Sequence, residues 1–142
     1  EAVVLSKPTK RYELLIRHIT KLRPEKETNI ADSLLKACTV FLSVKKNLLK
    51  HFILLTDGIP TTNNQEATRN ELENKIIYEV RKMRKIGITI SVICIRDDLE
   101  ENDTALAKRI ASIGGGSFSM VNTQNLLNQI LREYSNVKSQ EI

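Results

Sequence analysis

The sequence has no tryptophan and few aromatic residues of any kind, which limits what the protein can bind. Aromatic residues make up 4% of the 142 residues. Proteins that bind single-stranded nucleic acid stack bases on aromatic side chains and hold phosphates with clustered cations. The net charge is +5, and the excess lies in residues 1–50, which hold 11 basic and 5 acidic residues. Without aromatic platforms we interpret these cations as solvated helix surfaces, and we do not expect a nucleic-acid partner.

Cysteine and histidine are also scarce. Cys38 and Cys94 each lie in an apolar stretch, and the chain has no CxxC pair or zinc-ligand spacing. The two histidines, His18 and His51, are isolated, so we interpret them as surface or boundary residues rather than ligands. Buried free thiols are typical of a reducing compartment, which predicts a cytoplasmic protein.

Long apolar runs and the common catalytic motifs are missing as well. No stretch of about 18 apolar residues could span a membrane, and no secretory signal is visible. The chain has neither a GxxxxGK[ST] phosphate loop nor a GxSxG nucleophile motif. The composition, 41% apolar and 27% charged, is that of an ordinary globular domain. We therefore expect one domain over residues 1–142 and no enzymatic activity.

What is present is an alternation of apolar runs with helical patterns. The runs at 52–56 and 88–95 are nearly continuous in apolar residues, as in strands of a parallel sheet buried on both faces. Shorter runs at 2–6 and 117–121 predict two further strands.

Apolar spacing predicts helices over 11–22, 30–42, 69–86, 105–113 and 124–134, with Thr68 and Thr123 as the expected caps of the third and the last. The expected apolar stripes are Leu34, Leu35, Cys38, Phe41 and Leu42 in the second helix and Leu126, Leu127, Ile130, Leu131 and Tyr134 in the last. The glycines at 114–116 are expected to end the fourth helix rather than to bind a phosphate. The order of strands and helices indicates an α/β fold, with a mostly parallel sheet and helices on both faces.

Asp57 is the first candidate for chemistry, because it directly follows the most apolar strand. Ligands of open α/β sheets bind beyond the carboxyl ends of the strands, and Gly58 lets the backbone turn sharply there. Asp57 could cap the following turn, or it could serve as a metal ligand or a catalytic acid. A phospho-acceptor role is disfavoured because Pro60 follows closely and the required acidic cluster is absent.

Thr28 and Asn29 form the second candidate, in the loop before a helix. Asn29 could cap that helix, and Thr28 could have only a helix-capping role as well. Taken with Asp57, the Thr28 hydroxyl could instead converge on a hard cation such as Mg²⁺, which prefers oxygen ligands.

Two segments of the chain, TNIADSLLKA and FILLTDGIP, resemble the central signature of von Willebrand factor A domains. The resemblance continues through GITISVICI, AKRIASIGGGSFSMV and NLLNQIL, to about residue 134. It implies a Rossmann-like three-layer sandwich that binds another protein through a metal-ion-dependent adhesion site. In that site Mg²⁺ or Mn²⁺ is completed by an acidic residue of the partner. The family's threonine corresponds to Thr28 and its later aspartate to Asp57, with Asn29 and Gly58 shaping the two loops.

The chain departs from the family at its N-terminal end. The family's Asp-x-Ser-x-Ser motif is absent, and AVVLSKPTK resembles the family's antiparallel edge strand instead. We therefore expect the N-terminal part of the fold to be missing from this chain. Sequence upstream of Glu1, a nicked fragment or another subunit would supply it. Thr28 and Asp57 alone should hold Mg²⁺ only weakly.

The resemblance leaves two alternatives to a metal-dependent binding module. The chain could be a structural interaction domain that uses no metal. It could also be the adaptor subunit of a MoxR-type or magnesium-chelatase-like AAA+ ATPase, a role that intracellular members of the family often have.

Overall fold

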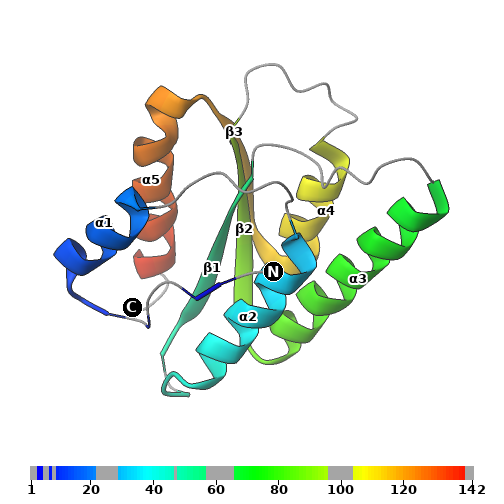
Figure 1. The fold of residues 1–142 in the computed structure, drawn as a ribbon, viewed down its shortest axis with the longest axis horizontal. Helices are drawn as coiled ribbons and strands as arrows, with labels where there is room; N and C mark the ends of the chain where they lie inside the picture. Colours follow the sequence, from blue (N-terminus) through cyan, green and yellow to red (C-terminus); the bar gives the residue numbers. More distant parts are fainter. Residues whose placement is uncertain are drawn as a thin grey trace.

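The computed structural model describes residues 3–4, 7, 9–21, 29–46, 48–56, 66–95 and 104–139. Within these ranges the chain forms three strands and five α-helices (Figure 1). The strands are β1 (Lys50–Thr56), β2 (Ile88–Ile95) and β3 (Gly115–Val121). The α-helices are α1 (Tyr12–Thr20), α2 (Ile30–Leu42), α3 (Glu66–Lys85), α4 (Ala105–Gly114) and α5 (Leu126–Ser139). A 3₁₀ helix, η2 (Thr123–Asn125), leads into α5.

The described strands form one parallel sheet in the order β1-β2-β3. Lys50 pairs with Ile88 at one end of β1, and Thr56 pairs with Cys94 at the other. Since α3 connects β1 to β2 and α4 connects β2 to β3, the carboxyl ends of all three strands meet at one edge. The predicted parallel α/β arrangement is confirmed.

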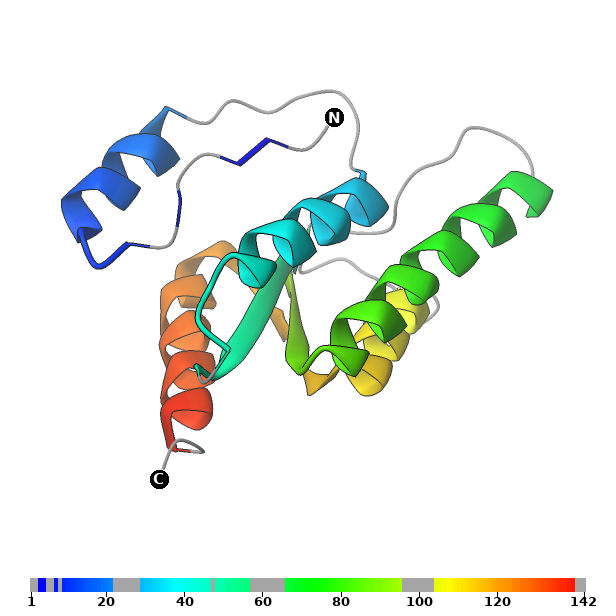
Figure 2. The same cartoon turned by 90° about the horizontal axis from the view of Figure 1, so that it is seen from below.

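Helices cover both faces of this sheet, which gives three layers. Helices α2, α3 and α4 lie on one face and α5 lies on the other (Figure 1). Figure 2 shows α1 beyond the β1 side of the sheet, and α1 packs closely on no other described element. Among the described helices none is long and apolar enough to cross a membrane.

The apolar core lies between the sheet and the three helices on its first face. Helix α3 supplies Ile76, Val80 and Met83, as its apolar spacing predicts. Other fully buried side chains of this layer are Leu34, Ile88, Ile90, Val92 and Ile110. This packing fixes α2, α3 and α4 against the sheet.

The start of α2 agrees with the sequence prediction, and its apolar stripe agrees in part. The Asn29 Oδ1 atom accepts a hydrogen bond from the backbone N–H of Asp32 at 3.0 Å, which is the predicted helix cap. Leu34 and Cys38 are buried as expected. Leu42 is exposed, so the stripe on α2 is narrower than predicted.

Two other helix starts were predicted wrongly. Helix α3 begins at Glu66, so Thr68 lies inside the helix instead of capping it. The last helical segment is capped by Asn122 rather than Thr123, because the Asn122 side chain accepts from the Asn125 N–H at 2.9 Å. Several capping residue types stand together at both places, and sequence alone does not choose among them.

The predicted strand over 2–6 is not supported by its described residues. Val3 and Val4 belong to no strand, and both side chains are exposed. The other residues of that range lie outside the described part of the chain.

Candidate functional site

The predicted metal-binding residues flank elements that end or begin at the carboxyl edge of the sheet. Strand β1 ends at Thr56, immediately before Asp57, and α2 begins at Ile30, two residues after Thr28. Figure 1 shows the start of α2 and the end of β1 toward the same side of the molecule. Thr28, Asp57 and Gly58 themselves lie outside the described residues, so their geometry stays a prediction.

Asn29 is described, and the start of α2 occupies both of its oxygen atoms. Its side-chain oxygen caps the N–H of Asp32, and its carbonyl oxygen accepts from the Ser33 N–H at 3.1 Å and the Ser33 hydroxyl at 2.9 Å. Asn29 therefore sets the conformation of the backbone that follows Thr28.

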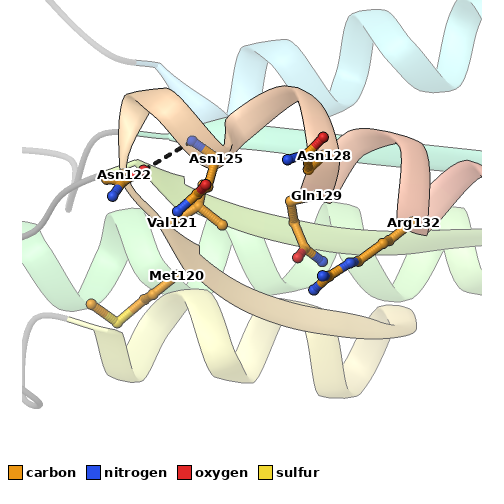
Figure 3. A pocket seen from close by; sticks show the side chains of 7 residues that line it. All are labelled: Met120, Val121, Asn122, Asn125, Asn128, Gln129 and Arg132. Carbon is orange, nitrogen blue, oxygen red and sulfur yellow. Dashed lines mark hydrogen bonds between the residues drawn. The ribbon is translucent and has the colours of Figure 1, made fainter.

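A polar groove opens at the same edge, where β3 ends and α5 begins (Figure 3). Its volume is about 580 Å³. It is lined by Met120, Val121, Asn122, Asn125, Asn128, Gln129 and Arg132. Among the described residues of this lining there are four carboxamides and one guanidinium but no carboxylate, histidine or thiol. Such a surface can donate and accept hydrogen bonds, and its described side chains include no nucleophile or general base.

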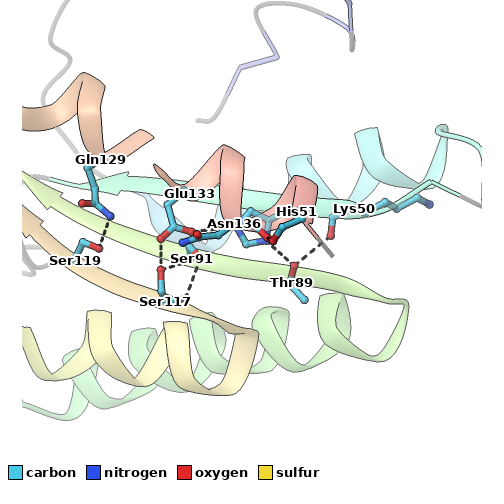
Figure 4. Close-up of polar contacts among 10 residues, drawn as sticks. Lys50, His51, Thr89, Ser91, Ser117, Ser119, Gln129, Glu133 and Asn136 are labelled. Carbon is cyan, nitrogen blue, oxygen red and sulfur yellow. Dashed lines mark hydrogen bonds and ion pairs between the residues drawn. The ribbon is translucent and has the colours of Figure 1, made fainter. Parts of the chain in front are cut away.

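A second polar cluster lies at the opposite edge, beneath the C-terminal half of α5 (Figure 4). It joins the amino-terminal parts of all three strands to the helix through His51, Thr89, Ser91, Ser117 and Glu133. The Ser117 hydroxyl donates to Glu133 Oε1, and the Ser117 N–H donates to Ser91 Oγ at 2.9 Å. Glu133 is only 4% exposed. Glutamate is rarely buried without a partner, and here Ser117 and His51 are the neighbouring polar groups.

His51 lies at the boundary of the core, one of the two environments expected for it, because the residue is partly buried and its side chain is only 9% exposed. The predicted apolar stripe of α5 is confirmed only in part. Leu126 and Ile130 are partly buried, whereas Leu127, Leu131 and Tyr134 are 66%, 53% and 58% exposed. Helix α5 turns Glu133 inward instead.

The signal for this polar layer was present in the strand sequences. Thr89 and Ser91 alternate with isoleucines in β2, and Ser117 and Ser119 alternate in β3. Residues two apart share one face of a strand, so these hydroxyls line the face beneath α5. Because apolar residues lie between these hydroxyls, the sequence predicted apolar contacts on both faces of β2.

The described residues include neither an activated thiol nor a cluster of metal-binding side chains. Cys38 and Cys94 are both buried and unpaired, as predicted. Burial raises the pKa of the Cys94 thiol, which keeps it protonated and unreactive. The described ranges contain no group of three histidine, cysteine or acidic side chains placed to hold a metal ion.

A family model described as von Willebrand factor type A domain matches residues 4–133, which include all three described strands. Comparison with curated proteins found no match.

Proposed function

This chain belongs to the von Willebrand factor type A domain family, and we propose that it works as a protein-binding module rather than as an enzyme. The observation that carries the proposal is the family match over residues 4–133, because domains of this family mediate protein–protein interactions.

The partner would dock on the carboxyl edge of the sheet. The groove at the end of β3 supports this choice, because its carboxamides can pair with the peptide groups or polar side chains of a protein. Arg132 adds a positive charge that no described acidic residue neutralises, since the described ion pairs involve other residues. An acidic side chain of the partner would suit this position.

A divalent cation, Mg²⁺ or Mn²⁺, would complete the same edge through Thr28 and Asp57. A hydroxyl and a carboxylate are the hard oxygen donors that these ions prefer. Asn29 fits its proposed loop-shaping role, because both of its oxygen atoms are engaged by α2 and it is not left as a ligand. Gly58 would shape the second loop. Two protein donors hold Mg²⁺ weakly, so further donors would come from the partner or from sequence outside this chain.

The missing part of the fold would dock on the outer edge of β1. Within the described sheet β1 is paired on one side only, with β2. An unpaired strand edge is a template for a further strand. Leu55 of β1 is 45% exposed, which leaves apolar surface on the face of the sheet for the added part to cover. Sequence upstream of Glu1, a nicked fragment or another subunit could supply that strand.

Affinity capture with Asp57→Ala tests the binding role and its metal dependence together. The immobilised chain would be incubated with an extract of its own cells, in Mg²⁺ or in EDTA, and bound proteins quantified by mass spectrometry. We expect a set of proteins that the wild type captures in Mg²⁺ and loses in EDTA. Asp57→Ala should reduce this set at least about tenfold, because one lost charged contact costs about 1.5–3 kcal/mol.

Glu71→Ala is the matched control, because it removes an exposed carboxylate from α3 and should leave capture unchanged. Equal capture by Asp57→Ala and wild type would rule out the metal-dependent version while leaving the binding module intact. Failure to enrich any protein over the bare matrix would contradict the binding role itself.

A further inference from the structure

His51 presents a buried ring nitrogen that has no hydrogen-bond partner. The side chain is 9% exposed, and its Nε2 atom is fully buried and makes no hydrogen bond. The group that faces this nitrogen is Glu133 Oε2, 3.8 Å away, on a side chain that is 5% exposed. Leaving a buried polar atom without a partner costs free energy, so a group that satisfies both atoms would stabilise the fold.

The hydrogen bonds on the other side of the ring show which nitrogen carries the proton. The Thr89 hydroxyl donates to the Lys50 carbonyl oxygen at 3.5 Å, and Thr89 Oγ1 lies 2.5 Å from His51 Nδ1 (Figure 4). Because the Thr89 proton is directed to Lys50, Nδ1–H is the donor in the contact between His51 and Thr89. In the neutral ring Nε2 therefore has a free lone pair. A histidine held through its other nitrogen in this way is typical of metal ligands.

Glu133 presents a second electron-pair donor to the same gap. Its Oε1 atom accepts a hydrogen bond from the Ser117 hydroxyl, which orients the carboxylate and leaves Oε2 toward His51. Two electron-pair donors thus face each other with no proton donor between them. A cation placed between them would interact favourably with both.

The distance between the two atoms favours a metal ion over a hydrogen bond or a bridging water. A separation of 3.8 Å is too long for an N–H···O bond. A water bound to both atoms would hold them about 4.6 Å apart, because each of its hydrogen bonds is about 2.8 Å long. Two ligands of one tetrahedral zinc ion lie about 3.4 Å apart, because Zn–N and Zn–O bonds are about 2.1 Å long. A side-chain movement of about 0.4 Å brings the pair to this spacing.

We propose that His51 Nε2 and Glu133 Oε2 bind a zinc ion that joins β1 to α5. An imidazole nitrogen suits zinc, whereas Mg²⁺ prefers oxygen donors. A hollow of about 410 Å³ beside the two side chains gives the ion a route and leaves room for water. Within the described ranges no third histidine, cysteine or acidic side chain joins this pair. Water and the carboxamide of Asn136, which lines the hollow, would complete the coordination.

Zinc at this position would hold the second half of α5 against the sheet. Because the ion binds only while His51 and Glu133 face each other, it stabilises the packed helix by mass action. At a zinc concentration about ten times Kd, hydrogen-exchange protection of α5 should rise about tenfold while that of α3 stays constant. Unchanged α5 protection at saturating zinc would contradict the link between β1 and α5.

The zinc site does not depend on the proposed protein-binding function. It lies at the amino-terminal edge of the sheet, whereas Thr28 and Asp57 flank elements at the carboxyl edge. Loss of zinc binding and loss of partner binding would therefore be separate results, obtained with different variants and different metals.

Titration of the intact wild-type chain with Zn²⁺, followed through the imidazole ¹H–¹³C resonances, tests the site at its ligand. We expect the His51 signals to shift saturably, and at lower zinc concentrations than those of His18, the other histidine of the chain. About a hundredfold excess of Mg²⁺ should leave the His51 signals unchanged. No shift at His51, or a shift at His18 at equal or lower zinc concentration, would overturn the proposal.

Variants measured by titration calorimetry test the two ligands separately. His51→Gln and Glu133→Gln should each weaken zinc binding at least about tenfold, since even the loss of an outer-shell partner of a metal ligand costs this much. His18→Gln is the matched control and should bind zinc as the wild type does. Equal zinc affinity in His51→Gln and the wild type would overturn the proposal, and the wild-type titration decides the case if a variant does not fold.

A variant that adds a ligand tests the position of the ion. Asn136 lies three residues after Glu133, and a helix supplies two metal ligands at the spacing Glu-x-x-His. Asn136→His should therefore strengthen zinc binding at least about tenfold. Asn128→His, in the first half of α5, is the control and should leave the affinity of the site unchanged. Equal effects of the two substitutions would contradict a zinc ion beside Glu133.

Discussion

Asn29 shows how one side chain decides where a helix begins. The first backbone N–H groups of a helix have no partner within it, and the Asn29 side chain supplies one to Asp32 at 3.0 Å. The same residue follows Thr28, so the cap also fixes the backbone next to a proposed metal ligand. At this position a structural role and a functional role share one residue.

Replacing Asn29 with alanine should destabilise the chain by about 1 kcal/mol, the usual cost of losing a helix cap. The free energy of unfolding in urea measures this change. Asn128→Ala is the control, because Asn128 lies exposed inside α5 and alanine is the better helix former. A loss for Asn128→Ala equal to that for Asn29→Ala would show that the effect is not capping.

At the scale of elements, the three consecutive glycines let β3 approach β2 directly after α4. Gly115 ends α4 in the left-handed region, with φ +70°, as a helix stop requires. A Cβ atom on Gly116 would lie 2.1 Å from the Ile90 carbonyl oxygen. This run is a structural junction, as the sequence predicts, and not a phosphate-binding loop.

Gly116→Ala and Gly87→Ala separate two costs of replacing glycine. Gly87 has φ +85° but open space around its Cα, so alanine there costs only backbone strain of about 1–2 kcal/mol. Gly116 meets backbone, which cannot move aside, so alanine should cost more than the roughly 1–3 kcal/mol of ordinary overpacking. Thermal unfolding measures both variants, and a milder effect at Gly116 than at Gly87 would refute this packing.

Sequence patterns predicted β2 and the face of α3 well, because the core there is made of aliphatic side chains at regular spacing. They failed for much of α5, because Leu127, Leu131 and Tyr134 lie exposed while Glu133 faces the sheet. The polar partners, His51, Ser91 and Glu133, are far apart in the sequence. The parallel register aligns the strands, and the packing of α5 brings Glu133 to them. For the metal site, local patterns left Thr28 and Asp57 between a capping role and a ligand role, and the motif resemblance favoured the ligand role.

At the scale of the whole molecule, α5 connects the two edges of the sheet. Its first half lines the groove at the carboxyl edge through Gln129 and Arg132, and its second half carries Glu133 to the polar cluster at the opposite edge. The outer edge of β1 also matters for the whole molecule, because the proposed further strand would pair with β1 there.

We propose that the edge between β1 and the start of α2 bears the metal and receives the partner. Paramagnetic broadening by Mn²⁺ in ¹H–¹⁵N spectra tests it most directly, because even weak binding broadens amide signals near the ion. We predict selective broadening at Thr56 and Asn29, lost in Asp57→Ala and kept in Glu71→Ala. Broadening centred elsewhere, or unchanged in Asp57→Ala, would contradict the claim.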